Sequence, residues 1–197
     1  MHNIDAPTLI RLAEQYCDNY HQGVFRKGTN EPYSKHPRSV REILARNGYY
    51  DYVTQCVALL HDVVEDTNVI TGEIKKCFGY EVANGVYILS KNTIKRDNTI
   101  LATISLTVDI SKLSDSELYR LRLLLARETI QRIKIADMID NTKDLESILP
   151  LSIEKKIAEA NDLYIPLGRK VAPIMVHELE QNIENYFKKV GRTQQIK

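Results

Sequence analysis

The chain has 197 residues, of which 43% are hydrophobic and 27% are charged, and its formal net charge is +1. This length and composition suit one globular domain over residues 1–197, with a real hydrophobic core. A net charge near zero gives no reason to expect nucleic acid as a partner, although a small charged substrate needs only local charge in a pocket.

Cysteine usage and the terminal sequence bear on where the protein works. Cys17, Cys56 and Cys77 are odd in number and far apart, with no CxxC pair. This argues against a disulfide framework and favours a reducing cytoplasm. Residues 1–5 lack the basic stretch and apolar run of a signal peptide. No apolar stretch approaches the ~20 residues of a membrane helix, so we expect no membrane partner.

In chain order, apolar residues recur mostly at helical spacing. Residues 21–35 are rich in Gly, Asn, Pro and Lys and predict a loop. The stretch 91–114 alternates in Thr103–Ile110, which is compatible with one short β-hairpin within 99–111 and equally with a loop. Since helices dominate, we predict an all-α fold, a compact helical bundle. The predicted helices cover 6–20, 36–47, 50–65, 70–77, 80–90, 115–130, 131–147, 152–162 and 170–189.

A first polar island, His61-Asp62-Val63-Val64-Glu65-Asp66-Thr67, ends the most apolar predicted helix. Charge buried there is costly unless a metal ion compensates it. If the helix continues, His61 and Glu65 share one face, and so do Asp62 and Asp66. The alternative is an exposed helix end whose carboxylates cap the next segment.

Two further islands carry residues of the same kinds. His36 precedes Pro37 at a predicted helix start, which gives it a rigid backbone and an exposed ring, although an ordinary histidine at a helix start fits the same pattern. Asp137 lies between apolar residues, with Asn141 one turn later. Its alternative is a solvent-facing aspartate paired with Lys134, three residues earlier.

Together these islands supply two imidazoles and two carboxylates. Such a set suits Mn²⁺, Fe²⁺, Co²⁺ or Zn²⁺ and leaves coordination positions open for water and substrate. Glu65 and Asp66 would then orient the water or carry its proton.

The order His36, His61-Asp62, Asp137 resembles the HD superfamily of metal-dependent phosphohydrolases. Further motifs are similar to RelA/SpoT-type hydrolases, and because the chain is short, it resembles their stand-alone branch, the small alarmone hydrolases. The similarity runs from about residue 10 to about residue 170. The motifs that carry it are Arg26-Lys27-Gly28-Thr29, Pro32-Tyr33, His36-Pro37, His61 to Thr67, Phe78 to Ala83, Leu89-Ser90-Lys91 and Lys134 to Asp137 with Asn141.

This resemblance implies a compact HD-domain bundle around a metal, usually Mn²⁺, and removal of pyrophosphate from the ribose 3′ position of ppGpp and pppGpp. It implies that the metal ligands are His36, His61, Asp62 and Asp137. By the same resemblance, Glu65 and Asp66 are the catalytic acidic pair, and Arg26, Lys27 and Asn141 contact the nucleotide. A guanidinium such as that of Arg26 can stack on a purine, and both cations suit a substrate rich in phosphate.

Some positions depart from the pattern. Met138 stands where the long enzymes usually have arginine, and Asp144 where they have threonine, which weakens guanine specificity more than metal-dependent hydrolysis. Tyr164 resembles a residue on a helix that lines the family's site, but a core tyrosine explains it as well.

Three functions therefore remain open at this point. The first is a Mn²⁺-dependent (p)ppGpp 3′-pyrophosphohydrolase. The second keeps the chemistry but acts on another nucleotide, as an NADPH phosphatase or a nucleoside monophosphate phosphatase. The third is a non-catalytic nucleotide-binding protein that has kept its metal site. The oligomeric state does not follow from the sequence.

Overall fold

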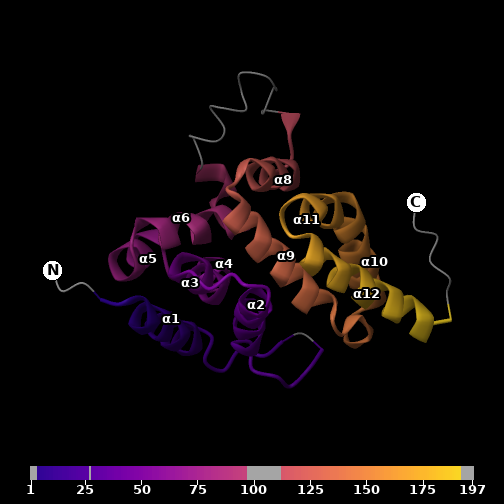
Figure 1. Cartoon of the computed structure of the whole chain (residues 1–197), viewed down its shortest axis with the longest axis horizontal. Helices are drawn as coiled ribbons and strands as arrows, with labels where there is room; N and C mark the ends of the chain where they lie inside the picture. Colours follow the sequence, from indigo (N-terminus) through magenta and orange to yellow (C-terminus); the bar gives the residue numbers. More distant parts are fainter. Residues whose placement is uncertain (1–3, 27, 97–111, 192–197) are drawn as a thin grey trace.

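The computed structural model describes residues 4–26, 28–96 and 112–191. These residues form an all-helical structure, as predicted (Figure 1). Among them the only β-type pairing is an isolated bridge between Phe25 and Pro32. The hairpin considered within 99–111 lies outside the described residues. No helix in the described part of the chain combines the length and apolar character needed to cross a membrane.

Periodicity located the helices before residue 97 to within a few residues, with one exception. The predicted helix 50–65 ends at Leu60, and a new helical turn begins after Asp62, so the expectation of one continuous helix was wrong. The elements, in chain order, are α1 (Ala6–Tyr20), α2 (Lys35–Arg46), α3 (Tyr52–Leu60), α4 (Val63–Asp66), α5 (Thr71–Phe78), α6 (Tyr80–Leu89) and the 3-10 helix η1 (Lys91–Arg96).

The second half differs more from the prediction. The chain leaves helix at Ala126, and the next helix ends at Thr142, five residues before the predicted 147. A π-helical turn and a further short α-helix then fill the predicted gap between 162 and 170. Pro166 is tolerated there because it falls in the first turn of a helix, where its missing N–H costs little. The elements are α8 (Asp115–Leu125), α9 (Glu128–Thr142), η3 (Leu145–Ser147), α10 (Pro150–Glu159), η4 (Ala160–Tyr164), α11 (Ile165–Val171) and α12 (Pro173–Lys189).

Helix α9 is the centre of the structure. It packs against α2, α3 and α6 on one side and against α11 and α12 on the other, and it runs between the two groups in Figure 1. Its buried residues lie on nearly all of its faces, which is the pattern of a helix enclosed by others. Asp137 and Asp140, which are among its buried residues, are therefore in the interior and need partners there.

Helix α3 is the second buried element. The Asp51 side chain caps its start by accepting a hydrogen bond from the Thr54 backbone N–H at 2.9 Å. Every residue from Thr54 to Leu60 is buried. The apolar helix thus carries His61, the next residue, into the protein interior, where it is only 2% exposed.

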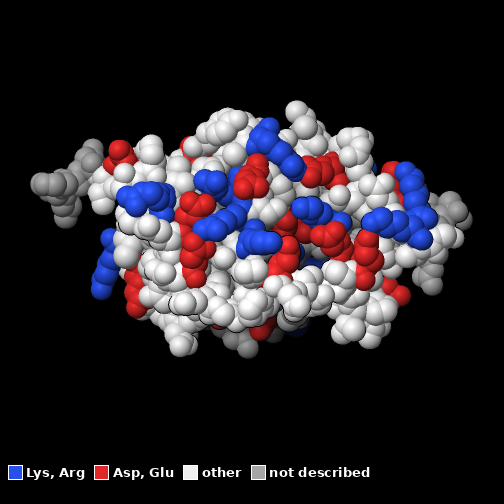
Figure 2. Space-filling model, turned by 90° about the horizontal axis from the view of Figure 1, so that it is seen from below, with Lys and Arg blue, Asp and Glu red and all other residues white. Residues whose placement is uncertain are grey.

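Surface charge is mixed in sign. Figure 2 shows Lys and Arg side chains interspersed with Asp and Glu over one whole face. That face therefore offers no continuous basic surface of the kind that binds a nucleic-acid backbone.

Candidate metal centre and active site

Side chains from three separate segments converge between α2, the end of α3 and α9. Nε2 of His36 lies 3.1 Å from Oδ1 of Asp137 and 3.5 Å from Oδ2 of Asp62. Nε2 of His61 lies 3.1 Å from the same Asp62 oxygen and 3.8 Å from the same Asp137 oxygen. The structure thus brings together the four residues that were predicted as metal ligands.

Burial rules against the alternative readings of these residues. His36 is 3% exposed, His61 2% and Asp137 4%. The solvent-facing aspartate is therefore excluded, and the expectation of an exposed His36 ring was wrong. The exposed helix end is excluded for His61, whereas Glu65 and Asp66, at the end of α4, are exposed. Asp137 does pair with Lys134, as its alternative required, but Nζ of Lys134 contacts Oδ2 at 2.5 Å inside the protein, not at the surface.

Both imidazoles are held from behind, at Nδ1. Nδ1 of His61 donates to the backbone oxygen of Ala58 at 2.8 Å, and Nδ1 of His36 donates to Oδ2 of Asp140 at 2.7 Å. Because a carbonyl and a carboxylate only accept, both rings carry the proton on Nδ1, which leaves Nε2 free to bind a cation.

The carboxylates also have supporting partners. The Tyr33 hydroxyl donates to Oδ2 of Asp62 at 2.7 Å, and the Asn141 amide donates to Oδ1 of Asp137 at 2.5 Å. Burial and the nearby Asp62 charge raise the pKa of Tyr33, so its hydroxyl remains a donor. Such contacts fix the direction of the oxygens that face the two imidazoles.

The electrostatics of the centre favour a bound cation. Burial opposes charge on both histidines, yet Asp62 and Asp137 outweigh it and raise the pKa of His61, and the same two carboxylates with Asp140 raise the pKa of His36. Burial likewise favours neutral carboxyls, but the surrounding cations and imidazoles lower the pKa of Asp62 and Asp137. The carboxylates thus remain ionised and attract positive charge.

A separate observation, an unsatisfied buried nitrogen, also indicates that these residues fit a divalent metal. Nε2 of His61 is buried and makes no hydrogen bond of acceptable geometry, although Asp62 is nearby. Leaving such an atom unsatisfied costs about 1–3 kcal/mol. Ligand atoms of His36, His61 and Asp62 all lie within 4.8 Å of one another, and imidazole nitrogen with carboxylate oxygen suits a borderline divalent ion.

Glu65 and Asp66 lie one turn beyond the ligands, at the solvent-exposed end of α4. The carboxylate of Glu65 accepts a hydrogen bond from the backbone N–H of Lys91 at 2.9 Å, which ties it to the start of η1. Partial burial and the charge of Asp62 raise the pKa of Asp66. The raised pKa therefore suits Asp66 to donate a proton.

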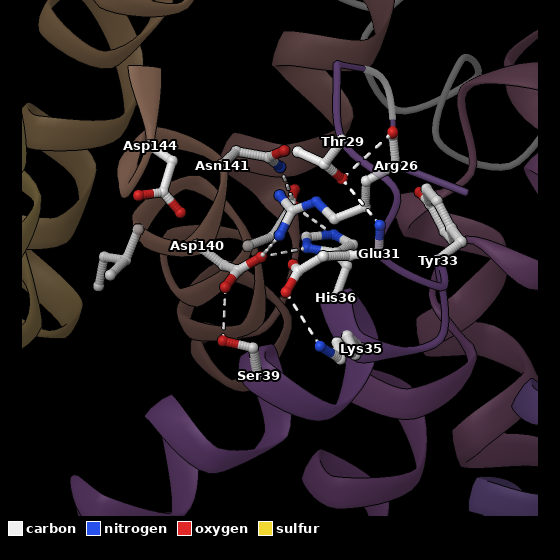
Figure 3. Close-up of polar contacts among 12 residues, drawn as sticks. Arg26, Thr29, Glu31, Tyr33, Lys35, His36, Ser39, Asp140, Asn141 and Asp144 are labelled. Carbon is white, nitrogen blue, oxygen red and sulfur yellow. Dashed lines mark hydrogen bonds and ion pairs between the residues drawn. The ribbon is translucent and has the colours of Figure 1, made fainter. Parts of the chain in front are cut away.

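Of the predicted nucleotide contacts, Lys27 lies outside the described residues. Arg26 approaches the centre from the loop before α2, and Nη1 donates to Oδ2 of Asp140 at 2.8 Å (Figure 3). Asn141 lies beside the same centre through its bond to Asp137. Met138 is buried in the core, so the departure there places no side chain at the surface of the site.

A cavity of about 410 Å³ lies near the Lys134 side of the centre. Tyr164 is both a buried core residue and part of its wall. The charges of Lys134 and Asp137 act on the hydroxyls of both Tyr119 and Tyr164, which shows how near this wall lies to the centre. The residues that line the cavity are Lys91, Asp115, Ser116, Tyr119, Arg120, Lys155, Ala158, Glu159, Asp162, Leu163 and Tyr164.

Comparison with known families decides the class of this site. The HD domain family matches residues 13–172, which include all four converging residues. The chain belongs to the HD domain family.

Relatives of this HD domain occur in much longer proteins. It is 30% identical over 179 residues to the bifunctional (p)ppGpp synthase/hydrolase SpoT of Escherichia coli K12, and that match covers 89% of this chain and 23% of SpoT. It is 31% identical over 183 residues to the guanosine-3′,5′-bis(diphosphate) 3′-pyrophosphohydrolase of Aquifex aeolicus, which covers 90% of this chain and 23% of that protein. The chain thus spans less than a quarter of these relatives.

The fold also matches a solved structure of similar length. That structure, described as "A metazoan ortholog of SpoT hydrolyzes ppGpp and plays a role in starvation responses", superposes with a TM-score of 0.70 at 23% identity. The match covers 98% of this chain and 100% of the other. It establishes the HD fold for this chain.

Two residues of the HD site were not singled out from the sequence. Tyr33 and Asp140 contact a candidate ligand directly, at Asp62 and His36 respectively. The signal for Asp140 was its position one helical turn after Asp137. Tyr33 lies in the turn before α2 and belongs to the Pro32-Tyr33 motif, which did not by itself give it a role at the site.

Proposed function

We propose that this protein is a Mn²⁺-dependent (p)ppGpp 3′-pyrophosphohydrolase, which converts ppGpp or pppGpp and water into GDP or GTP and pyrophosphate. The observation that carries the proposal is the convergence of His36, His61, Asp62 and Asp137, with the exposed pair Glu65 and Asp66 one turn away. The activities for which the relatives in Escherichia coli and Aquifex aeolicus are named supply the substrate class.

The residues divide the chemistry between them. His36, His61, Asp62 and Asp137 would hold a divalent cation, which supplies Lewis acidity to the phosphoryl group and lowers the pKa of water. Glu65 accepts a proton from the water that attacks the 3′ phosphorus. Asp66, with its raised pKa, returns a proton to the ribose 3′ oxygen as the bond between that oxygen and phosphorus breaks.

Substrate contacts follow from the same arrangement. Arg26 and Asn141 lie near Asp140 and Asp137 respectively, where a nucleoside whose 3′ phosphate lies at the cation would be placed. Lys27 precedes Gly28 in the same loop and would add a second cation for phosphate. We further propose that residues 1–197 act as one domain and that the enzyme is cytoplasmic, consistent with its free cysteines.

A second substrate class is supported by one observation. Arg26 is engaged by the Asp140 carboxylate, so part of its hydrogen-bonding capacity is unavailable to a guanine base. A nucleotide with another base, or NADPH, would then be accepted through its phosphate and ribose.

The test is a product assay with purified protein and Mn²⁺ over ppGpp, NADPH and nucleoside monophosphates. We expect GDP and pyrophosphate from ppGpp, abolished by EDTA and restored by Mn²⁺. Turnover of NADPH or a monophosphate alone would establish the second class instead. Nucleotide binding without turnover of any substrate, in metal-replete protein, would refute both and leave a binding protein.

A further inference from the structure

Asp140 is a buried carboxylate of α9 that the chemistry described so far does not use. It lies one turn after Asp137, and its side chain is 2% exposed. We propose that Asp140 is a positioning residue that couples the two halves of the site: it aims His36 at the cation, and it holds Arg26 at the rim where the nucleotide binds. The role toward Arg26 rests on the proposed function, whereas the role toward His36 requires only a bound cation.

The contact with His36 sets the tautomer of a ligand. Oδ2 of Asp140 accepts from Nδ1 of His36 at 2.7 Å, and the opposite ring atom, Nε2, faces Asp62 and Asp137. A metal-binding imidazole whose other nitrogen donates to a carboxylate is held in orientation and becomes a stronger ligand. His61 obtains the same restraint from a backbone oxygen, so only His36 depends on a side chain for it.

The contact with Arg26 uses the same oxygen. Nη1 of Arg26 lies 2.8 Å from Oδ2 (Figure 3), and the Arg26 side chain remains 24% exposed, so part of it is open to solvent. An arginine side chain loses up to about 2 kcal/mol of rotamer freedom when it is fixed. The ion pair imposes that loss before the nucleotide arrives, which favours binding.

Ser39 completes the arrangement. Its hydroxyl donates to the other oxygen, Oδ1 of Asp140, at 2.5 Å. Ser39 follows His36 by one turn of α2, so one helix supplies both the residue that Asp140 orients and the residue that fixes Asp140 (Figure 3). Both oxygens therefore have donors, and the carboxylate is held in one orientation.

The contact between Asp140 and Arg26 could simply tether the loop to α9, but a tether would not change how tightly the centre binds a metal. Metal affinity is therefore the deciding measurement. Asp140→Ala removes the acceptor for His36, and we expect Mn²⁺ to bind about 10- to 100-fold more weakly in calorimetric titrations. In Asp140→Asn the amide oxygen still accepts from His36 and the NH₂ group can donate to Ser39. Its Mn²⁺ affinity should therefore stay within about threefold of wild type.

Steady-state kinetics with ppGpp test the proposed role of Asp140 in positioning Arg26. Asp140→Asn removes the charge partner of Arg26, so KM should rise about three- to tenfold while kcat changes little. Arg26→Gln should raise KM similarly, and the double variant should raise it no further than either single change. Additive effects would overturn the coupling.

The control is Glu180→Gln, which breaks the ion pair with Arg169 between α11 and α12, far along the chain from the centre. It should leave Mn²⁺ affinity and KM unchanged. Unchanged Mn²⁺ affinity in Asp140→Ala would overturn the proposal that Asp140 orients His36.

If Asp140→Ala does not fold, ¹⁵N imidazole shifts of Zn²⁺-loaded wild type decide the matter, because a proton on Nε2 of His36 contradicts the proposal. Absence of ppGpp turnover in wild type would refute the proposed function and the role of Asp140 toward Arg26, but the Mn²⁺ titrations would still decide its role toward His36.

Discussion

At the scale of single residues, the carboxyl groups of the site differ in how readily they take up a proton. Asp62 and Asp137 are kept ionised by their surroundings, whereas Asp66 is shifted toward its protonated form. Glu65 lies outside the ligand cluster and accepts a hydrogen bond from the backbone N–H of Lys91. In the proposed mechanism, these differences let one group of carboxylates bind a cation while the neighbouring pair exchanges protons.

The role of Glu65 gives the first prediction. Glu65→Gln keeps the shape and the acceptor for the Lys91 N–H but cannot take a proton. We expect kcat for ppGpp to fall about 10²- to 10⁴-fold, with Mn²⁺ content unchanged by elemental analysis.

Glu154→Gln, which alters an exposed glutamate of α10, is the matched control and should retain wild-type kcat. Full activity in Glu65→Gln would contradict the assigned role of Glu65.

The second prediction concerns pH. Nearby carboxylates raise the pKa of both histidines, Asp62 and Asp137 in each case and Asp140 also at His36, so protons compete for Nε2 over a wider pH range than at an ordinary histidine. A divalent cation requires the neutral imidazole, and its binding must release those protons. Mn²⁺ affinity should therefore increase with pH and level off above the raised pKa values.

Calorimetry in buffers of different ionisation enthalpy measures this proton release directly. Equal Mn²⁺ affinity at pH 6 and pH 8, with no proton release, would show that the imidazoles are already neutral.

At the scale of elements, the loop over residues 21–34 is as important as the helices. Backbone bonds from Arg26 to Glu31 and from Tyr33 to Val24 fold it back on itself beside α2. It thereby delivers Arg26 to Asp140 and Tyr33 to Asp62. Changes in this loop should lower the affinity for the nucleotide more than the affinity for the cation, because the loop supplies none of the four candidate metal ligands.

Gly28 tests that separation. Its φ is +81°, and a Cβ there would lie 2.2 Å from the backbone oxygen of Ser147, which cannot move aside as a flexible side chain would. Gly28→Ala should displace the loop, raise KM for ppGpp on the order of tenfold, and leave Mn²⁺ affinity unchanged.

Gly23→Ala is the matched control for Gly28→Ala. Its φ is +77°, but no atom lies within 4 Å of the added Cβ, so it carries the backbone strain without the clash. Equal KM values in the two variants would show that the close approach to Ser147 has no role.

What sequence could predict also differs between elements. Apolar periodicity located α1, α2 and α6 well because each has one buried face. It missed the break after Leu60, since the apolar pattern continues from α3 into Val63 and Val64 and both intervening residues keep near-helical dihedral angles. It missed the π turn before Pro166 because proline normally ends a helix.

The break after Leu60 matters for function. A continuous helix would let His61 share a face with Glu65, and Asp62 share a face with Asp66. In the structure, His61 and Asp62 both face the centre, while Glu65 and Asp66 lie on the next turn at the exposed end. The ordered motifs indicated which residues would converge, but they could not indicate Asp140, whose role depends on the contact between α2 and α9.

At the scale of the whole molecule, the candidate ligands join parts of the chain that are distant in sequence. His36 belongs to α2, His61 and Asp62 to the turn after α3, and Asp137 to the central helix α9. A cation held by all four would be bound only by the folded chain, because the unfolded chain does not bring them together. Binding of that kind stabilises the native state by mass action.

The last prediction follows from this linkage. At a Mn²⁺ concentration about 100 times Kd, the native state should gain about 2.7 kcal/mol. For a chain of this size that corresponds to a rise in Tm of roughly 5–10 °C by differential scanning calorimetry. His61→Ala should abolish the rise, whereas His177→Ala, which removes an exposed histidine of α12, should retain it. An equal rise in both variants would mean that Mn²⁺ stabilises the protein from somewhere other than this centre.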